Sequence, residues 1–227
     1  MKEGRSRQKA EEKVSGKRIS YLSLDFEGTL VNSGYPEWYW KELIPYLYSK
    51  KKGVPLQESK NLILHDYETV GPDKAEWYTP IFWFKRYQME DEYETSIQAL
   101  KSRIKPFPDI KRLKLPYGIK LIICSGAWTD IIRAVLEEQN IGVYGIFVPS
   151  SFNMTKKNPD FYRHVCQILN ETDPSVFLHI GDDVQYDYFS PREAGWNSIL
   201  LDREGKIDQK GIKKIKSLSE LNQFFAV

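Results

Sequence analysis

The chain has 227 residues, of which 41% are hydrophobic and 28% are charged. These fractions match ordinary globular domains and exclude a disordered or fibrous protein. The length allows one core domain, or a core domain with a smaller one inserted into it. A formal net charge of +2, from 33 basic and 31 acidic side chains, produces no field that favours a nucleic acid or an anionic membrane as partner.

The N-terminal region, residues 1–18, mixes basic and acidic side chains and contains one large apolar residue, Val14. It lacks the apolar run of a secretory signal, and no later stretch approaches the ~18 apolar residues of a membrane helix. The two cysteines, Cys124 and Cys166, lie far apart without CxxC spacing, which is typical of a reducing compartment. We therefore expect a flexible tail over residues 1–18 and a soluble, cytoplasmic protein.

A first strand is predicted over residues 19–24, where an alternating pattern gives way to Asp25, Glu27 and Gly28. Further strands are predicted where apolar stretches end at polar residues, over 118–124, 143–148, 176–180 and 198–201. Between them, apolar residues at helical spacing predict helices, one of which opens at Pro159. This alternation predicts an α/β fold, a doubly wound, Rossmann-like parallel sheet that binds ligands at the carboxyl ends of its strands.

Residues 33–105 interrupt the alternation with aromatic side chains at helical spacing, among them Trp38, Trp40 and Trp83. We expect a small α-helical domain here, inserted into a core formed by residues 19–32 and 106–227. Because the insertion follows the first strand, it could lie over the carboxyl ends of the sheet as a lid. Its linkers are expected where small residues and prolines punctuate the chain, near 32–34 and 105–108.

Polar residues at the first two strand ends could carry chemistry. Asp25 could attack phosphorus as a nucleophile, and Glu27, two residues later, could move a proton. Such a pair in isolation is more often a solvated strand end with a turn glycine. Ser125 follows the second strand, where its hydroxyl could donate to a phosphoryl oxygen or serve only as a helix cap.

A lysine pair, Lys156 and Lys157, precedes the helix that opens at Pro159. One of these ammonium groups could offset the negative charge of a phosphorylated aspartate, although lysine pairs usually lie on the surface. These three polar clusters and a fourth, the acidic loop that begins at Asp182, are distant in sequence, yet the predicted sheet brings their strand ends to one edge. That convergence is the main evidence for a shared site.

An acidic loop with Asp182, Asp183 and Asp187 follows the strand that contains His179. Magnesium takes oxygen ligands and keeps several waters, so one or two of these carboxylates together with Asp25 would suffice to bind it. Capping of the next helix is the competing explanation for the acidic residues. His179, in an apolar strand without metal-ligand spacing, is predicted to be a hydrogen-bonded core histidine.

The four clusters, in this order, resemble the four motifs of the haloacid dehalogenase superfamily over residues 19–202. Residues 25–30, DFEGTL, fit the first phosphatase motif, DxDGTL, except at its second acid. Residues 181–187, GDDVQYD, followed by AGW at 194–196, fit the fourth motif in full. The placement of residues 33–105 resembles the helical cap of that superfamily, which closes over the site and selects the substrate.

The resemblance implies a phosphate site in which Asp25 forms an aspartyl-phosphate. Glu27 occupies the position of the aspartate that protonates the leaving oxygen and then activates water. The remaining phosphate-binding residues implied by the motifs are Thr29, Ser125, Gly126 and Lys156, with Lys157 as the alternative lysine. Magnesium is expected on Asp25, the backbone carbonyl of Glu27 and Asp182, supported by Asp183 or Asp187.

Glu27 is the departure from the motif, because its side chain is one methylene longer than aspartate. The leading hypothesis is a magnesium-dependent hydrolase of small phosphomonoesters, with a small phosphorylated metabolite as its partner and neither nucleic acid nor membrane. The alternative is a phosphate- or metabolite-binding protein whose turnover is impaired by Glu27. A 2-haloacid dehalogenase is a weaker hypothesis. Dehalogenation needs no metal, whereas the complete fourth motif indicates magnesium, and no arginine closely follows the first motif to hold a substrate carboxylate.

Overall fold

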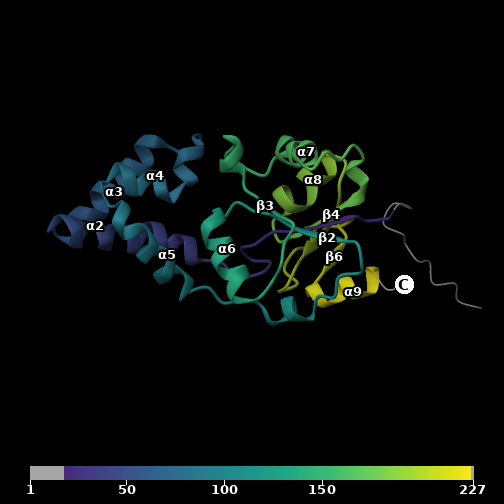
Figure 1. The fold of residues 1–227 in the computed structure, drawn as a ribbon. Coiled ribbons are helices and arrows are strands. Elements are labelled where there is room, and N and C mark those ends of the chain that lie inside the picture. The colour runs from purple at the N-terminus through teal and green to yellow at the C-terminus, as the bar shows by residue number, and fades with distance from the viewer. Residues whose placement is uncertain (1–17, 226–227) are drawn as a thin grey trace, which may run out of the picture.

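The computed structural model describes residues 18–225, so the tail expected over residues 1–18 lies, except for Arg18, outside the described residues (Figure 1). The strands are β1 (Tyr21–Leu24), β2 (Lys120–Cys124), β3 (Gly145–Phe147), β4 (Phe177–Gly181), β5 (Asn197–Leu201) and β6 (Lys214–Ile215). The α-helices are α1 (Tyr35–Trp38), α2 (Ile44–Lys52), α3 (Leu56–Val70), α4 (Pro80–Arg86), α5 (Tyr93–Lys101), α6 (Thr129–Glu138), α7 (Pro159–Ile168), α8 (Ser190–Glu193) and α9 (Leu221–Phe224). Two π-helical turns, η1 (Tyr39–Leu43) and η7 (Val184–Phe189), precede α2 and α8. None of the described helices is long and apolar enough to span a membrane.

The six strands form one sheet in the order β3-β2-β1-β4-β5-β6, and every neighbouring pair is parallel. The chain starts in the middle of the sheet and builds outward in both directions, which confirms the doubly wound α/β fold. The strand β6 was not predicted, because two residues are too few to show a periodic pattern.

Alternating side chains of β1 separate the two apolar faces of the sheet. Leu22 and Leu24 belong to a core cluster that also contains the buried residues of α6 and α9. Tyr21 points to the opposite cluster, which contains those of α7. Figure 1 shows the same division, with α7 and α8 on one side of the sheet and α9 on the other. Helices on both faces leave the carboxyl ends of the strands as the edge at which polar side chains gather.

Between β1 and β2 every regular element is helical, and Figure 1 shows α2 to α5 grouped beside the sheet, beyond α6. We call residues 35–101 the helical segment. The chain enters and leaves it at one place, where Asn32 and Lys105 exchange hydrogen bonds: the Asn32 N–H donates to the Lys105 carbonyl at 3.0 Å, and the Lys105 N–H donates to Asn32 Oδ1 at 2.6 Å. Division of the chain into separate domains at residues 33 and 105 stays a prediction.

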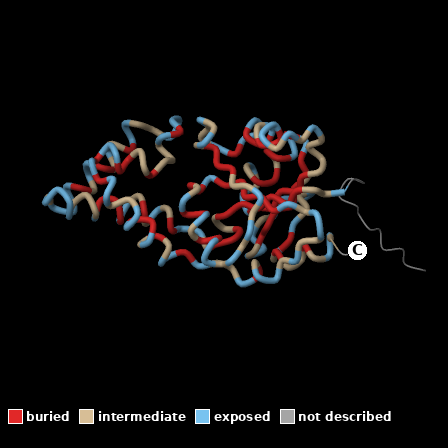
Figure 2. The backbone as a smooth tube through the Cα atoms, viewed as in Figure 1, coloured by how far each residue is buried: buried red, intermediate tan, exposed pale blue. Residues whose placement is uncertain are grey.

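The helical segment has an aromatic core that contacts the α/β core at Trp128, in the loop between β2 and α6. The Trp128 ring lies 5.0 Å from that of Tyr39 and 5.7 Å from that of Trp40, measured between centroids. Figure 2 shows buried residues running through the sheet and along the inside of the helical segment. One cluster of buried residues includes both Trp83 of α4 and Leu24 of β1, so apolar packing is continuous between the two regions.

Candidate active site

The site lies at the carboxyl ends of β1, β2 and β4, because β1 pairs with both of the other strands. Leu24 lies opposite Ile123 on one side and Ile180 on the other, so the residue that follows it, Asp25, emerges between two strand ends. The Asp25 N–H donates to the Ile180 carbonyl at 2.9 Å and fixes the backbone there. Residues separated by more than 150 positions in the chain thus meet at one edge, as the sequence predicted.

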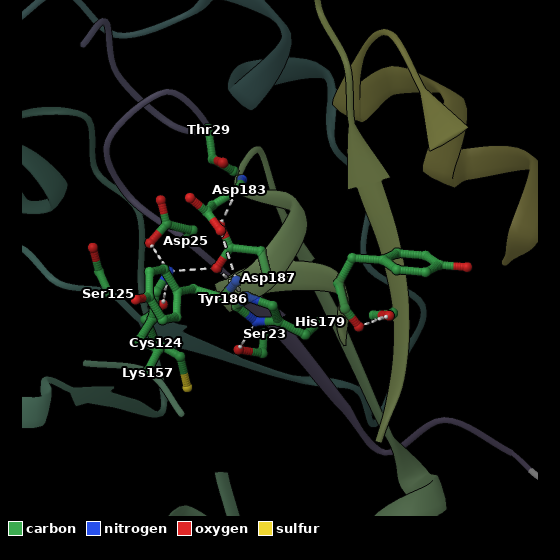
Figure 3. Close-up of polar contacts among 12 residues, drawn as sticks. Ser23, Asp25, Thr29, Cys124, Ser125, Lys157, His179, Asp183, Tyr186 and Asp187 are labelled. Atoms are coloured by element: carbon green, nitrogen blue, oxygen red, sulfur yellow. Dashed lines mark hydrogen bonds and ion pairs between the residues drawn. The ribbon is translucent and has the colours of Figure 1, made fainter. Parts of the chain in front are cut away.

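A buried charged network forms the centre of the site. Figure 3 shows the ammonium group of Lys157 between the carboxylates of Asp25 and Asp187. The Lys157 Nζ donates to Asp25 Oδ1 at 2.5 Å and also contacts Asp187 Oδ1. All three side chains are at most 8% exposed. Charges buried so deeply are stable only when paired, so each member of this network holds the others in place.

His179 supports the network from inside the sheet. Its Nε2 lies 3.0 Å from Asp187 Oδ1 and its Nδ1 lies 2.8 Å from Ser23 Oγ. Burial lowers the pKa of His179, so the ring is neutral at physiological pH. A neutral ring that donates from Nε2 and accepts from the Ser23 hydroxyl satisfies both contacts. The prediction of a hydrogen-bonded core histidine is confirmed.

The pKa values in the network show how its charges are distributed. Burial raises the pKa of Asp25 above its usual range, and the negative charge of Asp187 adds to this, although Lys157 opposes both. Burial alone would also raise the pKa of Asp187, but the charge of Lys157 and the hydrogen bond to His179 hold it well below its usual range. Burial opposes ionisation of Lys157, yet Asp187 and Asp25 raise its pKa, so it stays charged.

Three carboxyl groups could together hold a cation: Asp25, Asp182 and Asp187 each offer an oxygen, and these oxygens lie within 4.8 Å of one another. Partial desolvation of the Asp182 carboxyl and the negative charge of Asp187 together raise its pKa to about 6. With Lys157 as the neighbouring cation, the ionised cluster keeps a formal charge of −2. An all-oxygen, anionic donor set of this kind fits Mg²⁺.

A glycine makes room for Asp182 in this cluster. Gly28 has a φ angle of +74°, and a Cβ atom added there would lie 2.2 Å from Asp182 Oδ2. Only glycine combines that backbone conformation with so close an approach. The next residue, Thr29, donates from Oγ1 to Asp182 Oδ1 at 3.5 Å. The structure thus places Thr29, expected to bind substrate, against a carboxylate of the acidic loop.

The remaining acidic residues of the predicted metal set have other contacts. Asp183 caps η7: its Oδ1 accepts a hydrogen bond from the Tyr186 N–H at 2.6 Å, while its own N–H donates to Asp187 Oδ2 at 3.0 Å. Capping, the competing explanation, therefore describes the Asp183 side chain. The Glu27 carboxylate accepts a hydrogen bond from the Gly34 N–H at 3.1 Å, while the binding of a metal by the Glu27 backbone carbonyl stays a prediction.

At the end of β2, Ser125 is 1% exposed and lies at the same edge of the sheet. Its Oγ accepts a hydrogen bond from the Ala127 N–H at 3.2 Å, which leaves its own proton available for donation. Gly126 is exposed, and no atom lies within 4 Å of the position that its Cβ would occupy.

The lysine assignment is corrected. Lys157, the alternative, contacts Asp25, whereas Lys156 is exposed and its Nζ lies 5.9 Å from the ring centroid of Tyr186. Asn158, the next residue, caps α7 with its Oδ1, which accepts from the Phe161 N–H at 3.0 Å. Directly before this cap, Lys157 is buried because its ammonium group pairs with the carboxylates of Asp25 and Asp187. Adjacent lysines give no sequence signal that separates them.

Comparisons with known proteins agree with the fold. Residues 19–195 match the family described as haloacid dehalogenase-like hydrolases. The GMP/IMP nucleotidase YrfG of Escherichia coli strain K12 is 23% identical over 77 residues, which cover 34% of this chain and 34% of that protein. The chain thus matches about a third of the length of this curated relative.

Two solved structures extend the similarity over nearly the whole chain. A HAD phosphatase from Thermococcus onnurineus superimposes with a TM-score of 0.69 at 18% identity, over 92% of this chain and 98% of that one. A 2-haloacid dehalogenase from Pseudomonas syringae pv. Tomato DC3000 gives a TM-score of 0.67 at 16% identity, over the same shares. At such low identity these likenesses show a shared fold.

Proposed function

Because the chain belongs to the family of haloacid dehalogenase-like hydrolases, we propose that it hydrolyses small phosphomonoesters with magnesium through an aspartyl-phosphate on Asp25. The observation that carries this proposal is the buried Asp25–Lys157 pair, surrounded by further carboxylates within 4.8 Å. A nucleophilic carboxylate, a fixed cation and an anionic oxygen cluster are the parts that phosphoryl transfer to an aspartate requires.

In the first step, a carboxylate oxygen of Asp25 forms a bond to phosphorus and the bond from phosphorus to the leaving oxygen breaks. Lys157 holds Oδ1 of Asp25 and limits the side chain to one orientation, which favours attack by the other oxygen. The same ammonium group offsets negative charge on the phosphorylated aspartate. Ser125, whose hydroxyl proton is available, donates to a phosphoryl oxygen.

Glu27 transfers the protons. It gives one to the leaving oxygen in the first step and takes one from the water that then hydrolyses the aspartyl-phosphate, releasing inorganic phosphate. Burial raises the pKa of Glu27, which favours the protonated acid needed first; the hydrogen bond from the Gly34 N–H opposes this, and the negative charge of Asp182 adds to it. The hydrogen bond from the Gly34 N–H holds the longer side chain in a defined position.

The residues that would hold Mg²⁺ are Asp25 and Asp182, with Asp187 as the third carboxylate of the cluster. The raised pKa values of Asp25 and Asp182, caused mainly by burial and also by the negative charge of Asp187, support this, because a bound cation would favour the ionised form of both carboxyl groups. Mg²⁺ supplies Lewis-acid stabilisation to phosphoryl oxygens and neutralises their charge.

The helical segment would select the substrate. A cavity of about 250 Å³ lies where it meets the α/β core. The lining residues come from both regions: Thr79, Pro80, Ile81 and Tyr93 from the helical segment, and Trp128, Thr129, Asp130, Val148, Ser150 and Ser151 from the core. Trp128 follows Ser125 by three residues in the chain, and the role we propose for this mixed polar and apolar cavity is to receive the leaving group of a small phosphorylated metabolite.

Hydrolysis of p-nitrophenyl phosphate tests the proposal, with wild type, Glu27→Asp and Glu27→Gln compared with and without Mg²⁺. We expect metal-dependent release of p-nitrophenol by wild type and a loss of about 10²–10⁴-fold in Glu27→Gln, as for removal of a proton-transfer group. A silent wild type beside an active Glu27→Asp variant would favour the impaired binding protein. Metal-independent release of chloride from 2-chloropropionate would instead favour the dehalogenase.

A substrate panel defines the leaving group. The curated relative is named for hydrolysis of GMP and IMP, so purine nucleoside monophosphates belong in the panel beside sugar phosphates and glycerol phosphate. The expected result is a preference among these esters. Equal rates for all of them would contradict a selective role for the helical segment.

A further inference from the structure

Tyr35 has a buried hydroxyl group that nothing in the described part of the chain satisfies. The residue is 3% exposed, and its hydroxyl has no hydrogen-bond partner among residues 18–225. A buried polar atom without a partner costs about 1–3 kcal/mol, so such atoms are rare and each requires an explanation. A ligand oxygen that arrives only during the reaction would provide one.

The position of Tyr35 relates it to the first motif. Its ring packs edge-on against Phe26, with centroids 6.5 Å apart and planes at 82°, and Phe26 separates Asp25 from Glu27 in the chain. The preceding residue, Gly34, donates its N–H to Glu27 Oε1 at 3.1 Å. A φ angle of +88° at Gly34, which favours glycine, turns the chain so that Tyr35 packs back onto this motif.

The electrostatic surroundings agree with that position. Burial raises the pKa of the Tyr35 hydroxyl well above its ordinary value, and the negative charges of Glu27 and Asp25 raise it further. The hydroxyl therefore keeps its proton at neutral pH and is a donor within the field of both carboxylates. The larger of the two contributions comes from Glu27, the group that faces the leaving oxygen in the proposed reaction.

Another buried tyrosine of the helical segment shows the usual arrangement. The hydroxyl of Tyr39, next along the same run of helix, lies 2.9 Å from Ser96 Oγ and is fully paired inside the protein. Tyr87, at the end of α4 and away from the sheet in Figure 1, has its buried hydroxyl beside the carboxylate of Asp66, which can accept a hydrogen bond from it. Tyr35 differs from both because its ring packs on Phe26, the residue between Asp25 and Glu27, while its hydroxyl has no partner among the described residues.

We propose that the Tyr35 hydroxyl donates a hydrogen bond to the substrate oxygen that leaves phosphorus, beside Glu27. The substrate class rests on the proposed function. Attack by Asp25 places the leaving oxygen on the far side of phosphorus, and Glu27 transfers its proton to that oxygen as the bond to phosphorus breaks. Tyr35 keeps its own proton; its hydrogen bond orients the leaving oxygen toward the longer acid side chain and stabilises the negative charge that develops there.

Tyr35→Phe tests this, with Tyr87→Phe as the control that removes another buried tyrosine hydroxyl of the helical segment, away from the first motif. Three measurements are needed: urea unfolding without ligand, calorimetric binding of inorganic phosphate with Mg²⁺, and kcat/KM for p-nitrophenyl phosphate and glycerol phosphate. Inorganic phosphate has an oxygen at the leaving position, so it reports the contact without turnover.

For Tyr35→Phe we expect unfolding at the same or higher urea concentration, because an unpaired polar atom has been removed. Phosphate affinity and kcat/KM should fall about 10- to 100-fold, which is the loss expected when a hydrogen bond to a charged group is removed. The loss should be larger for glycerol phosphate, whose alkoxide is the poorer leaving group. Tyr87→Phe should change neither affinity nor kcat/KM.

Unchanged phosphate affinity in Tyr35→Phe would overturn the proposal, as would a loss of stability that accounts for the lost activity. A wild type that binds phosphate but hydrolyses no ester contradicts the proposed function, while the affinities of the two variants still decide the role of Tyr35. A wild type that binds no phosphate overturns the proposal for Tyr35 directly.

Discussion

The carboxyl edge of the sheet and the helical segment have interiors of different chemistry. At the sheet, Asp25, Lys157, Asp187 and His179 form one continuous network of buried charged and polar groups. In the helical segment, aromatic rings fill the interior, as in the edge-on contact between Tyr67 and Trp83 at 4.6 Å. Substitutions at the sheet edge should therefore alter chemistry and stability together, whereas substitutions in the aromatic interior of the helical segment, away from Tyr35, should alter mainly stability.

The largest effect is expected from Asp25→Asn. An amide is a poor nucleophile, so turnover of p-nitrophenyl phosphate should fall by more than about 10⁴-fold. The fold should persist, because the side chain lies at a strand end and Lys157 keeps its contact with Asp187. Steady-state kinetics and circular dichroism check the two halves of the prediction; an active variant would mean that another group is the nucleophile.

The adjacent lysines sharpen the comparison within one dipeptide. Lys157→Met leaves two buried carboxylates without their cation and should cost about 3–5 kcal/mol of unfolding free energy, together with activity. Lys156→Met, a change of the same chemistry at an exposed position, should stay within about 0.5 kcal/mol of wild type. Urea unfolding curves measure both. Equal effects would show that the network does not depend on which lysine is buried.

The continuity of the two regions can be tested with a matched pair of isoleucines. Ile63 of α3 and Ile199 of β5 are both 0% exposed and belong to one core cluster. Each substitution by alanine should cost about 3 kcal/mol. Because packing is continuous, we expect a single unfolding transition that shifts as a whole in both variants. Two transitions, with only one shifted by Ile63→Ala, would show that the helical segment unfolds independently.

The smallest effect concerns Mg²⁺ and pH. The pKa of Asp182 is about 6 in the folded protein, above its ordinary 3.8, so the folded state retains a proton that the unfolded chain has released. The protonated Asp182 carboxyl therefore contributes to the stability of the folded state. This contribution is complete below pH 3.8 and is lost as pH rises through 6, where the ionised cluster gains affinity for cations.

At pH 7.5, Mg²⁺ at 100 times its Kd should therefore stabilise the protein by about 2.7 kcal/mol, or roughly 5–10 °C in Tm. The shift should be less than half as large at pH 5, where protons compete for the same carboxylates. Thermal unfolding with Mg²⁺, and with EDTA as the control, measures it. A shift independent of pH would place the cation elsewhere.

Much of the site follows from local sequence patterns. Strand ends are marked by apolar stretches that stop at Asp25 and at Ser125, whichever strands pair. Parallel pairing then brings these ends to one edge of the sheet. The acidic loop that begins at Asp182 was found by the same reasoning. The role of His179 followed from its place in an apolar strand, where only a neutral, hydrogen-bonded ring is stable.

The sequence by itself determined the α/β fold and the strand ends that carry the site, because periodicity and polar termination are properties of short segments. Tertiary structure alone decided between Lys156 and Lys157, since only the folded chain brings one of the two ammonium groups against the buried carboxylates of Asp25 and Asp187. It also left the Tyr35 hydroxyl, whose ring packs on the first motif, without a hydrogen-bond partner among residues 18–225. Pairing and burial are set by groups that converge from distant parts of the chain, and no local pattern records them.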